Sequence, residues 1–431
     1  MNLFMRQIID LHIHSKYSRA CSRDLELPKI AKTCETKGID ICATGDFTHP
    51  AWLAHIKENL KEENEGIYKL NPASQGCRAS RTKFIIGTEI ASIKKHKDKT
   101  RRLHLCIFAP DLKIAEKFNK VLEGRGFNLK SDGRPILGMT AKDILELMLE
   151  VDERMVMIPA HAWTPWFGIF GSKGGYDTLE ECFEDLTPNI FAIETGLSSD
   201  PLMNWRLSVL DKIALVSNSD AHSLGKLGRE ANVLDFKNEK EITYDKLMRT
   251  VKEKNPKEFL HTIEFYPEEG KYHMDGHKDC HFFCEPEQSK KMNNICPKCK
   301  KKLVIGVMNR VMELSDRSVV EAKKAGRTPY KSLVPLDAVL ADTLGVGANT
   351  KKVKTEYDNL IKKIGNEFFI LLDSDIKDIA KASDKNIATA IKKAREGDIC
   401  IKPGYDGEFG IVKIFKEGEN KVGFKQVKID L

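Results

Sequence analysis

The sequence predicts an α/β fold for about the first 230 residues, followed by two smaller regions. Short apolar runs alternate there with amphipathic stretches of helical periodicity, such as Thr140–Met148 and Pro201–Asp211. Strand–helix alternation implies βα units around a parallel sheet. Seven apolar runs recur, and about seven such units suit a barrel: Gln7–His14, Ile39–Asp46, Lys83–Ile90, Leu103–Ala109, Met155–His161, Ile190–Glu194 and Ile213–Asp220.

Length and composition are typical of a globular protein of two or three domains. The chain has 431 residues, of which 41% are hydrophobic and 31% charged. Its 70 Lys and Arg against 63 Asp and Glu give a net charge of +7, which permits binding to a polyanion without establishing it. The N-terminal residues lack the features of a signal peptide, and no apolar run approaches the ~20 residues of a membrane span. We therefore expect a cytoplasmic protein with no membrane partner.

Polar residues capable of chemistry stand at or beside the C-terminal ends of the predicted strands. In barrels of βα units, that end of the barrel carries the active site. The residues placed there are His14, Asp46, Glu89, His161, Glu194 and Asp220.

Histidines and carboxylates of the first domain, residues 1–255, form a candidate metal centre. His12 and His14 lie on one face of a strand and can bind one metal together. Glu89 offers a carboxylate, which can bridge two divalent metals. The remaining candidates are His104, His161, Asp220 and His222. A satisfied core histidine is the commoner role for any one of these, but it accounts poorly for all of them together.

Nitrogen and oxygen ligands of this kind suit Zn, Mn, Mg or Fe without selecting among them. Two divalent ions about 3.5–4 Å apart lower the pKa of bound water and clamp the oxygens of a phosphoryl centre. We therefore expect phosphoester hydrolysis by a metal-activated hydroxide, with Glu89, Asp220 and His222 as the catalytic residues.

Several short strings resemble the polymerase and histidinol phosphatase (PHP) family. They are Asp10–Ser15, Gly45–His49, Gly87–Glu89, His104, Pro159–His161 and Ser219–His222. The resemblance implies a distorted (β/α)7 barrel that holds two or three metals. It places the first metal at His12, His14, Glu89 and Asp220, and the second at Glu89, His104 and His161.

A third metal would use His222 with residues near Asp46 and His49. Many members of the PHP family have Asp-His where this chain has Asp46-Phe47, with His49 three residues after Asp46. The chain therefore departs from the family pattern at this third position.

A second metal site is predicted from cysteine spacing, within a module at residues 256–305. Cys280 and Cys284 precede the Cys-x-x-Cys pair Cys296 and Cys299. Two such clusters ~10–20 residues apart form a closed, structural zinc site. Either His277 or Cys284 can be the fourth ligand, and the matched spacing of His277 and Cys280 favours His277.

The region 306–431 reads as helical and basic, ending in short β hairpins from Gly397 onward. The segment Leu344–Lys352 resembles a helix–hairpin–helix, in which a glycine-rich turn binds a DNA phosphate; an ordinary turn is the alternative. Its candidate DNA-binding residues are Gly345, Gly347, Lys351 and Lys352. A sliding clamp is a possible partner, although Lys428–Leu431 at the C-terminus shows no clear clamp-binding motif.

Nearly the whole chain resembles the endonuclease Q family. The strings that carry this resemblance are Pro159–Lys173, Glu194–Pro201, Tyr272–His277 and Pro403–Gly410. The resemblance implies binding to damaged DNA and a nick on the 5′ side of deaminated bases (uracil, hypoxanthine, xanthine) or of abasic sites. The alternatives are a phosphatase of the same fold acting on a small phosphate monoester, and a non-catalytic DNA-binding protein.

The loop Trp163–Tyr176 follows directly on His161 and is rich in aromatic residues. An enzyme that inspects a base must extract it from the stack and hold it, often by aromatic stacking. We hypothesise that the loop lines a base pocket or wedges the duplex; the alternative is that its rings pack the barrel mouth. The residues concerned are Trp163, Trp166, Phe167, Phe170 and Lys173.

Overall fold

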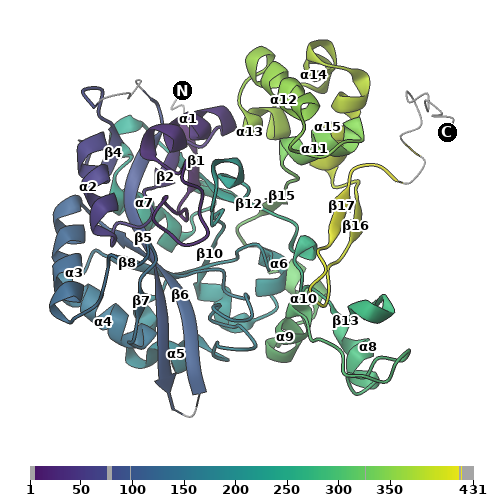
Figure 1. Cartoon of the computed structure of the whole chain (residues 1–431), viewed down its shortest axis with the longest axis horizontal. Helices are drawn as coiled ribbons and strands as arrows, with labels where there is room; N and C mark the ends of the chain where they lie inside the picture. Colours follow the sequence, from purple (N-terminus) through teal and green to yellow (C-terminus); the bar gives the residue numbers. More distant parts are fainter. Residues whose placement is uncertain (1–4, 75–79, 98, 326, 417–418, 420–431) are drawn as a thin grey trace.

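The computed structural model describes residues 5–74, 80–97, 99–325, 327–416 and 419. A large mixed α/β lobe contains the central sheet, and most of the chain after residue 270 forms a smaller lobe beside it (Figure 1). The predicted α/β class is confirmed. The C-terminal residues Lys428–Leu431, where a clamp-binding motif would be sought, lie outside the described residues.

The central sheet has the hydrogen-bonded order β15-β12-β11-β1-β2-β5-β4-β3, with β6 and β7 also paired to β5 and β8 paired to β6. A separate parallel pair is formed by β9 and β10. The strands of this lobe are β1 (Met5–Asp10), β2 (Ile41–Ala43), β3 (Leu60–Asn64), β4 (Ile67–Leu70), β5 (Lys83–His96), β6 (Lys99–Ala109), β7 (Ile136–Leu137), β8 (Val156–Pro159), β9 (Ala192–Glu194), β10 (Ala214–Val216), β11 (Ala231–Phe236), β12 (Phe259–Glu264) and β15 (Tyr330–Ser332).

Each of the seven predicted apolar runs contains a strand, but their hydrogen bonding does not close into a (β/α)7 barrel among the described residues. β1 pairs with β2 along one edge and with β11 along the other. Neither edge of β1 is therefore left to pair with β10. The residues that follow β10 meet those that follow β1 at an isolated bridge between Ile13 and Ala221. A hairpin, with no helix, joins β5 to β6, so β6 runs antiparallel to both of its neighbours.

Helices cover this lobe where the sequence has helical periodicity. The Thr140 side chain caps α4 and completes a capping box with Asp143, as expected for the stretch that begins there. The helices are α1 (Leu27–Lys37), α2 (Pro50–Asn59), α3 (Leu112–Gly124), α4 (Ala141–Val151), α5 (Leu179–Phe183), α6 (Pro201–Asn204) and α7 (Tyr244–Glu253). Among the described helices, none is both long and apolar enough to span a bilayer.

The stretch Pro201–Asp211, predicted as one helix, is broken into α6 and a 3-10 turn at Ser208–Lys212. The backbone N–H of Ser208 donates to the carboxylate of Asp316 at 2.8 Å. The carbonyl of Arg206 accepts hydrogen bonds from the backbone N–H groups of Asp316 and Arg317. These contacts from a distant segment hold the chain extended at residue 207 and end the helix early.

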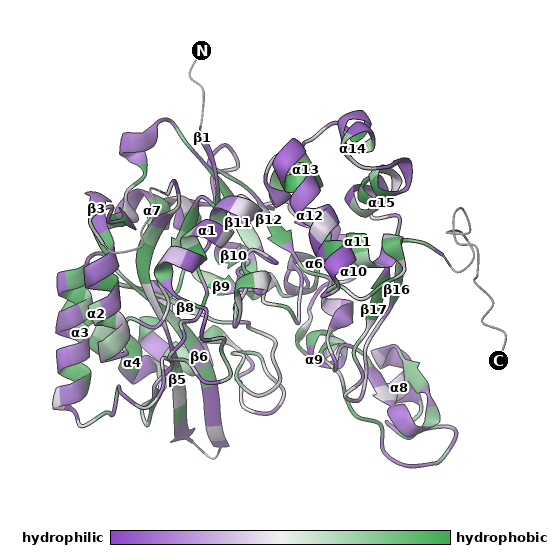
Figure 2. Ribbon diagram, turned by 45° about the horizontal axis from the view of Figure 1, so that its top comes forward, coloured by the Kyte–Doolittle hydropathy of each residue, from purple (hydrophilic) through white to green (hydrophobic). Residues whose placement is uncertain are grey.

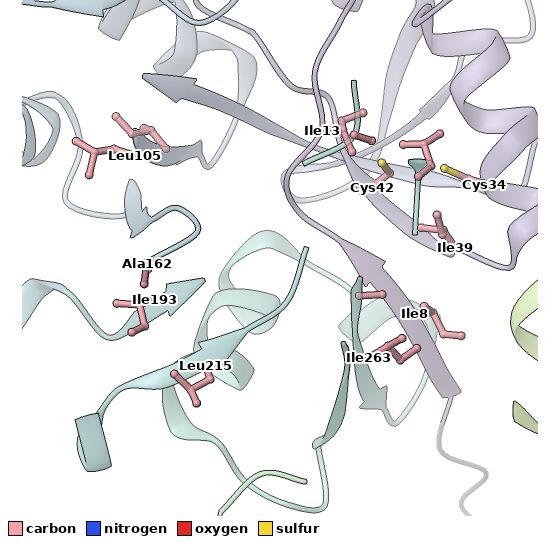
Figure 3. Packing of buried hydrophobic residues seen from close by; sticks show 14 of the residues in the cluster. Ile8, Ile13, Cys34, Ile39, Cys42, Leu105, Ala162, Ile193, Leu215 and Ile263 are labelled. Atoms are coloured by element: carbon pink, nitrogen blue, oxygen red, sulfur yellow. The ribbon is translucent and has the colours of Figure 1, made fainter. Parts of the chain in front are cut away.

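Alternate residues of the strands pack into two separate hydrophobic clusters. Ile8 and Phe84 belong to a large cluster shared with the outer helices, whereas their neighbours Ile9 and Ile85 belong to a second cluster with α7. Figure 3 shows part of the first cluster, in which Ile13, Cys34 and Ile39 meet beside β1. This burial on both faces explains why the strands read as continuous apolar runs.

The smaller lobe begins with a hairpin and ends with five helices and another hairpin. Its elements are β13 (Asp275–His277), β14 (Phe282–Cys284), α8 (Pro286–Lys291), α9 (Val307–Leu314), α10 (Val319–Lys323), α11 (Leu336–Leu344), α12 (Lys351–Lys363), α13 (Glu367–Leu372), α14 (Ile376–Ala382), α15 (Lys385–Glu396), β16 (Cys400–Lys402) and β17 (Ile411–Lys413). Between α10 and α11 the chain returns to the central sheet as β15, parallel to β12. In Figure 2 hydrophilic and hydrophobic residues alternate along these helices.

A buried ion pair connects the C-terminal helices to the larger lobe. Lys37 at the end of α1 and Glu367 at the start of α13 are 8% and 5% exposed, with Nζ and Oε2 3.1 Å apart. Tyr357 donates its hydroxyl to the same carboxylate at 2.7 Å, and the backbone N–H of Leu336 donates to its other oxygen. Burial acts to raise the pKa of Glu367, but the Lys37 ammonium, the Tyr357 hydroxyl and the Leu336 N–H together outweigh it and hold that pKa below its usual value.

Candidate metal centre

Strand ends of the larger lobe gather the predicted ligands into one buried cluster. His12 and His14 follow β1, His161 follows β8, and Asp220 follows β10. His161 and Asp220 adopt positive φ angles of 31° and 46°, in the left-handed region that non-glycine residues rarely occupy. Unfavourable backbone angles of this kind concentrate at functional sites, where the surrounding structure holds them in place.

The carboxylate of Glu89, on β5, lies at the centre of the cluster. Its Oε1 is 2.9 Å from His104 Nδ1, 3.2 Å from His161 Nε2 and 3.5 Å from His12 Nε2. Its Oε2 is 3.3 Å from His14 Nε2. One buried carboxylate therefore contacts four imidazoles, as a bridging ligand would.

Asp220 supplies a second carboxylate at the open edge of the cluster. Its Oδ1 lies 3.1 Å from His14 Nε2, 3.7 Å from His12 Nε2 and 3.4 Å from His222 Nδ1. The side chains of Asp220 and His222 are 25% and 33% exposed, whereas Glu89 is fully buried. A substrate approaching from solvent meets Asp220 and His222 first.

These residues fit the requirements of divalent cations. Ligand atoms within 4.8 Å of one another form three overlapping groups: His12–His14–Glu89, Glu89–His104–His161 and His14–Asp220–His222. The Nε2 atom of His12 is buried without a hydrogen-bond partner, although it faces Glu89 and Asp220. An unpartnered buried nitrogen between two carboxylates is costly unless a cation binds there.

Protonation states in the cluster also suit metal binding. Burial acts to raise the pKa of Glu89, but the imidazoles of His104 and His12 outweigh it and hold that pKa well below its usual range. Burial lowers the pKa of His104 to about 4. Metals require an ionised carboxylate and a neutral imidazole, which are the forms favoured for Glu89 and His104. Neighbouring acidic groups outweigh burial and raise the pKa values of His12, His14 and His161, so a cation would displace protons from these three.

A second layer of carboxylates orients the first two histidines. Glu194 accepts from His12 Nδ1 at 3.1 Å, from the backbone N–H of His161 at 2.7 Å and from Asn218 Nδ2 at 2.9 Å. Together with Cys106, His12 and Glu194 form a further group of possible ligands. The hydrogen bonds of Glu194 leave Nε2 of His12 directed at the cluster, as in many metal sites.

Asp46 and His49, expected beside a third metal, are placed elsewhere. Asp46 contacts His14 Nδ1 at 3.1 Å, behind that imidazole, and accepts hydrogen bonds from Ser15 and Ser18. His49 stacks on Tyr17, with ring centroids 4.3 Å apart. Neither belongs to a group of possible ligands among the described residues. The hydrogen bonds from Ser15 and Ser18 converge on Oδ2 of Asp46, and Oδ1 faces His14 Nδ1, so Asp46 orients His14 as Glu194 orients His12.

Arg134 is a site residue that the sequence did not reveal. Its Nη1 donates to Glu89 Oε2 at 2.9 Å, and its side chain is 21% exposed at the open edge of the cluster. Gly133 makes this position possible, because a Cβ there would collide with Asp46 and Ser18. In the sequence, Gly124–Leu137 has only the character of a polar insertion, and a lone arginine in such a loop carries no recognisable spacing.

The aromatic loop splits into buried and exposed parts. Trp163 and Phe170 are 1% and 0% exposed and pack together in the hydrophobic core of the larger lobe, which favours a packing role for these two rings. Phe167 stacks on the ligand candidate His104, with centroids 4.2 Å apart. Trp166 is 53% exposed, and Lys173 is also exposed, so these two residues face solvent.

The cysteine module brings four possible ligands together. His277, Cys280, Cys296 and Cys299 have ligand atoms within 4.8 Å of one another. Cys284 lies outside this group and is buried against Cys296 and Leu303. The geometry therefore favours His277 over Cys284.

The predicted helix–hairpin–helix turn joins α11 to α12. Gly345 ends α11 with a φ of 63°, and Thr350 caps α12 by accepting from the backbone N–H of Val353. Gly345 and Gly347 are exposed, and Lys351 and Lys352 follow in the first turn of α12. A turn of this form can present backbone N–H groups to a phosphate.

Solved structures of similar fold cover the whole chain. A crystal structure of the lesion-specific endonuclease PfuEndoQ from Pyrococcus furiosus matches 95% of this chain and 95% of that chain, with a TM-score of 0.82 and 31% sequence identity. The chain belongs to the endonuclease Q family. A structure of endonuclease Q in complex with a 27-mer duplex substrate, with an abasic lesion at the active site, covers 98% of this chain and 100% of that chain at 30% identity and a TM-score of 0.81.

Further relatives of this endonuclease Q homologue are known from sequence. The family model of the MJ0043 C-terminal domain matches residues 335–398. The uncharacterized protein MJ0043 of Methanocaldococcus jannaschii is 32% identical over 294 residues, which are 67% of this chain but only 35% of that protein. The chain thus spans about a third of that relative. The uncharacterized protein YqxK of Bacillus subtilis is 28% identical over 94% of this chain and 98% of its own length.

Replacing Glu194 tests its role as an orienting residue. Glu194→Gln removes an acceptor that fixes His12 and the backbone of His161, so we expect Mn²⁺ or Zn²⁺ to bind about 10- to 100-fold more weakly in a calorimetric titration. Glu230→Gln is the matched control, since Glu230 is equally buried and accepts from the backbone N–H of Phe265, outside the cluster. Equal affinity in Glu194→Gln and the parent protein would show that His12 needs no such support.

Proposed function

We propose that this protein is a metal-dependent DNA repair endonuclease that nicks the phosphodiester 5′ to a deaminated base or an abasic site. The observation that carries the proposal is the cluster of imidazoles and carboxylates around Glu89, on a chain similar along its full length to a lesion-specific endonuclease. The similarity extends over the cysteine module and the C-terminal helices, which a small phosphate monoester would not require. This favours the endonuclease over the phosphatase alternative.

The open edge of the cluster is where a phosphodiester would enter. Divalent cations held by the imidazoles and carboxylates supply Lewis acidity toward phosphate oxygens and lower the pKa of water. Arg134, with its guanidinium at this edge, can bind a non-bridging phosphate oxygen. His222 is the most exposed imidazole of the cluster and can hold a proton close to the leaving oxygen. Glu89 and Asp220 hold the negative charge that keeps the cations in place.

The arrangement of the strands is consistent with a distorted PHP barrel in which β9 and β10 complete the ring without continuous hydrogen bonding. Single contacts support this, since the backbone N–H of Ala162 donates to the carbonyl of Glu194 and Ile13 bridges Ala221. Two or three divalent metals, of the set Zn, Mn, Mg and Fe, would occupy the overlapping ligand groups. The DNA contacts at Gly345, Gly347, Lys351 and Lys352 stay a prediction, as does a sliding-clamp partner.

Cleavage of defined lesions tests the activity. We expect the protein with Mn²⁺ or Mg²⁺ to give a single nick 5′ to a deoxyuridine, deoxyinosine or abasic site in a labelled duplex, and to leave the undamaged duplex intact. Asp220→Ala should lower the rate at least ~100-fold, because Asp220 contacts three imidazoles of the cluster. Hydrolysis of small phosphate esters without a nick in any damaged duplex would contradict the proposal.

Zinc content tests the ligands of the cysteine module. His277→Ala should lose one zinc per chain in elemental analysis, because His277 lies within the tetrad. Cys284→Ser should keep its zinc, since Cys284 packs in the small core beside it. The opposite pattern would make Cys284 the fourth ligand.

Trp166 is the aromatic residue of the loop best placed to touch a displaced base. Stacking on a base contributes ~1–3 kcal/mol, so Trp166→Ala should weaken binding to an abasic or deoxyuridine duplex by roughly 5- to 150-fold in fluorescence anisotropy. Because Trp166 is half exposed, thermal melting should not change. Unaltered lesion binding with a lowered melting temperature would mean that Trp166 only packs the barrel mouth.

A further inference from the structure

The two longest strands of the larger lobe continue well past the rest of the sheet. β5 and β6 stay paired from Ile86 with Ala109 to His96 with Lys99. The last residue of β5 that pairs with another strand is Ser92, and on β6 it is Leu105. Beyond these two residues, β5 and β6 pair only with each other. Figure 1 shows the two arrows projecting together beyond the helices of the larger lobe. We call the projecting part, residues 93–97 and 99–102, the basic ribbon.

The basic ribbon grows directly out of the candidate metal centre. Glu89 lies on β5 and His104 on β6, at the base of the ribbon. His96 lies about seven residues beyond Glu89, which at ~3.3 Å per residue places the end of β5 about 23 Å from Glu89. A rigid two-stranded arm therefore extends from two of the ligand candidates toward solvent.

Positive charge dominates this arm. Lys94, Lys95, Lys97 and Lys99 are exposed, and none of them lies within ion-pair distance of a carboxylate among the described residues. Two carboxylates lie near the ribbon: Glu184 is 3.7 Å from His96, and Asp177 is close enough to Lys99 for that ammonium to contribute to its lowered pKa. Arg101 and Arg102 lie nearer the base, over the rings of Tyr176 and Trp166 at 4.2 and 5.6 Å. In Figure 2 the projecting ends of β5 and β6 are hydrophilic.

Both faces of the ribbon carry the charge. Pairing of Lys94 with Arg101 and of His96 with Lys99 places Lys94 and Lys99 on one face, and the strand alternation places Lys95 and Arg102 on the other. Lysines that only keep a surface solvated would not require a regular two-stranded arm of this kind. One face is partly covered, because His96 Nδ1 lies 2.8 Å from the Tyr176 hydroxyl and Arg101 lies over the same ring. The exposed lysines of a narrow arm nevertheless have the shape and sign that suit a groove of duplex DNA.

We propose that the basic ribbon binds backbone phosphates of the duplex that flanks the scissile bond. This inference rests on the proposed endonuclease function. Lysine is a flexible point charge that contacts phosphates without reading bases, so the contact would be independent of sequence. At ~3.4 Å per base pair, an arm of this length covers about seven base pairs on one side of the lesion.

Removal of the charge tests the proposal on binding alone. In the variant Lys94→Gln, Lys95→Gln, Lys97→Gln, Lys99→Gln, we expect the Kd for a duplex of about 40 undamaged base pairs to rise at least ~10-fold at about 0.1 M salt. The slope of log K against log salt should become shallower by ~0.9 for each phosphate that the variant no longer contacts. The matched control removes four other exposed lysines from α1, β3 and α3 (Lys32, Lys61, Lys113 and Lys120) and should change both quantities much less.

The position of the lesion tests where the ribbon lies. If the abasic site lies about five base pairs from the end on the side of the ribbon, little duplex is left for the ribbon to contact. The ribbon variant should then bind as well as the parent protein. With the same site about five base pairs from the other end, it should still bind more weakly. At saturating protein, the single-turnover nicking rate should stay within about twofold of the parent rate.

Each other outcome overturns the inference. Equal Kd values for the ribbon variant and the parent protein would show that the ribbon does not touch DNA. If the control variant binds as weakly as the ribbon variant, the effect reflects only the loss of net charge. Normal binding with slow nicking would mean that the ribbon only positions Glu89 and His104. If the parent protein nicks no damaged duplex, the proposed function fails, while the binding measurements still decide whether the ribbon contacts DNA.

Discussion

The charge of Glu89, buried at the junction of four imidazoles, is the constraint on which the rest of the larger lobe depends. A carboxylate without exposure to water must be balanced by its surroundings. Here Arg134 and the imidazoles of His12 and His14, whose pKa values are raised, provide the balance, while His104 contacts Glu89 as a neutral imidazole. Those residues come from separate segments of the chain. The framework that brings them to one point consists of the strands, the residues with positive φ angles at the strand ends, and the loop around Gly133.

The ligand set could be predicted because metal chemistry uses few residue types, and because strand ends of a βα fold meet at one face. His12, His14, Glu89, His104, His161 and Asp220 were identified in this way, and the structure brings them together. Asp46 was misplaced because sequence does not show on which side of an imidazole a carboxylate will lie. Arg134 was missed because its position is determined by tertiary contacts of Gly133 with Asp46 and Ser18.

The fold shows the same division between local and long-range information. Seven apolar runs predicted seven strands correctly, since each run must be buried on both faces. The pairing of β11 with the outer edge of β1, which prevents closure of the ring, depends on contacts between residues more than 200 positions apart. The break after α6 likewise depends on Asp316. In the aromatic loop, composition suggested five similar residues, but burial separates Trp163 and Phe170 from Trp166.

The ion pair of Lys37 and Glu367 has a consequence for how this protein can be recombined with its relatives. The region that matches the MJ0043 C-terminal domain begins at residue 335, yet the cation that pairs with its Glu367 is Lys37 on α1, the first helix after the segment that carries His12 and His14. A helical region transferred from one relative to another would therefore arrive with an acidic side chain whose partner stayed behind. To keep this buried ion pair, an exchange of the module between homologues would have to carry both positions together.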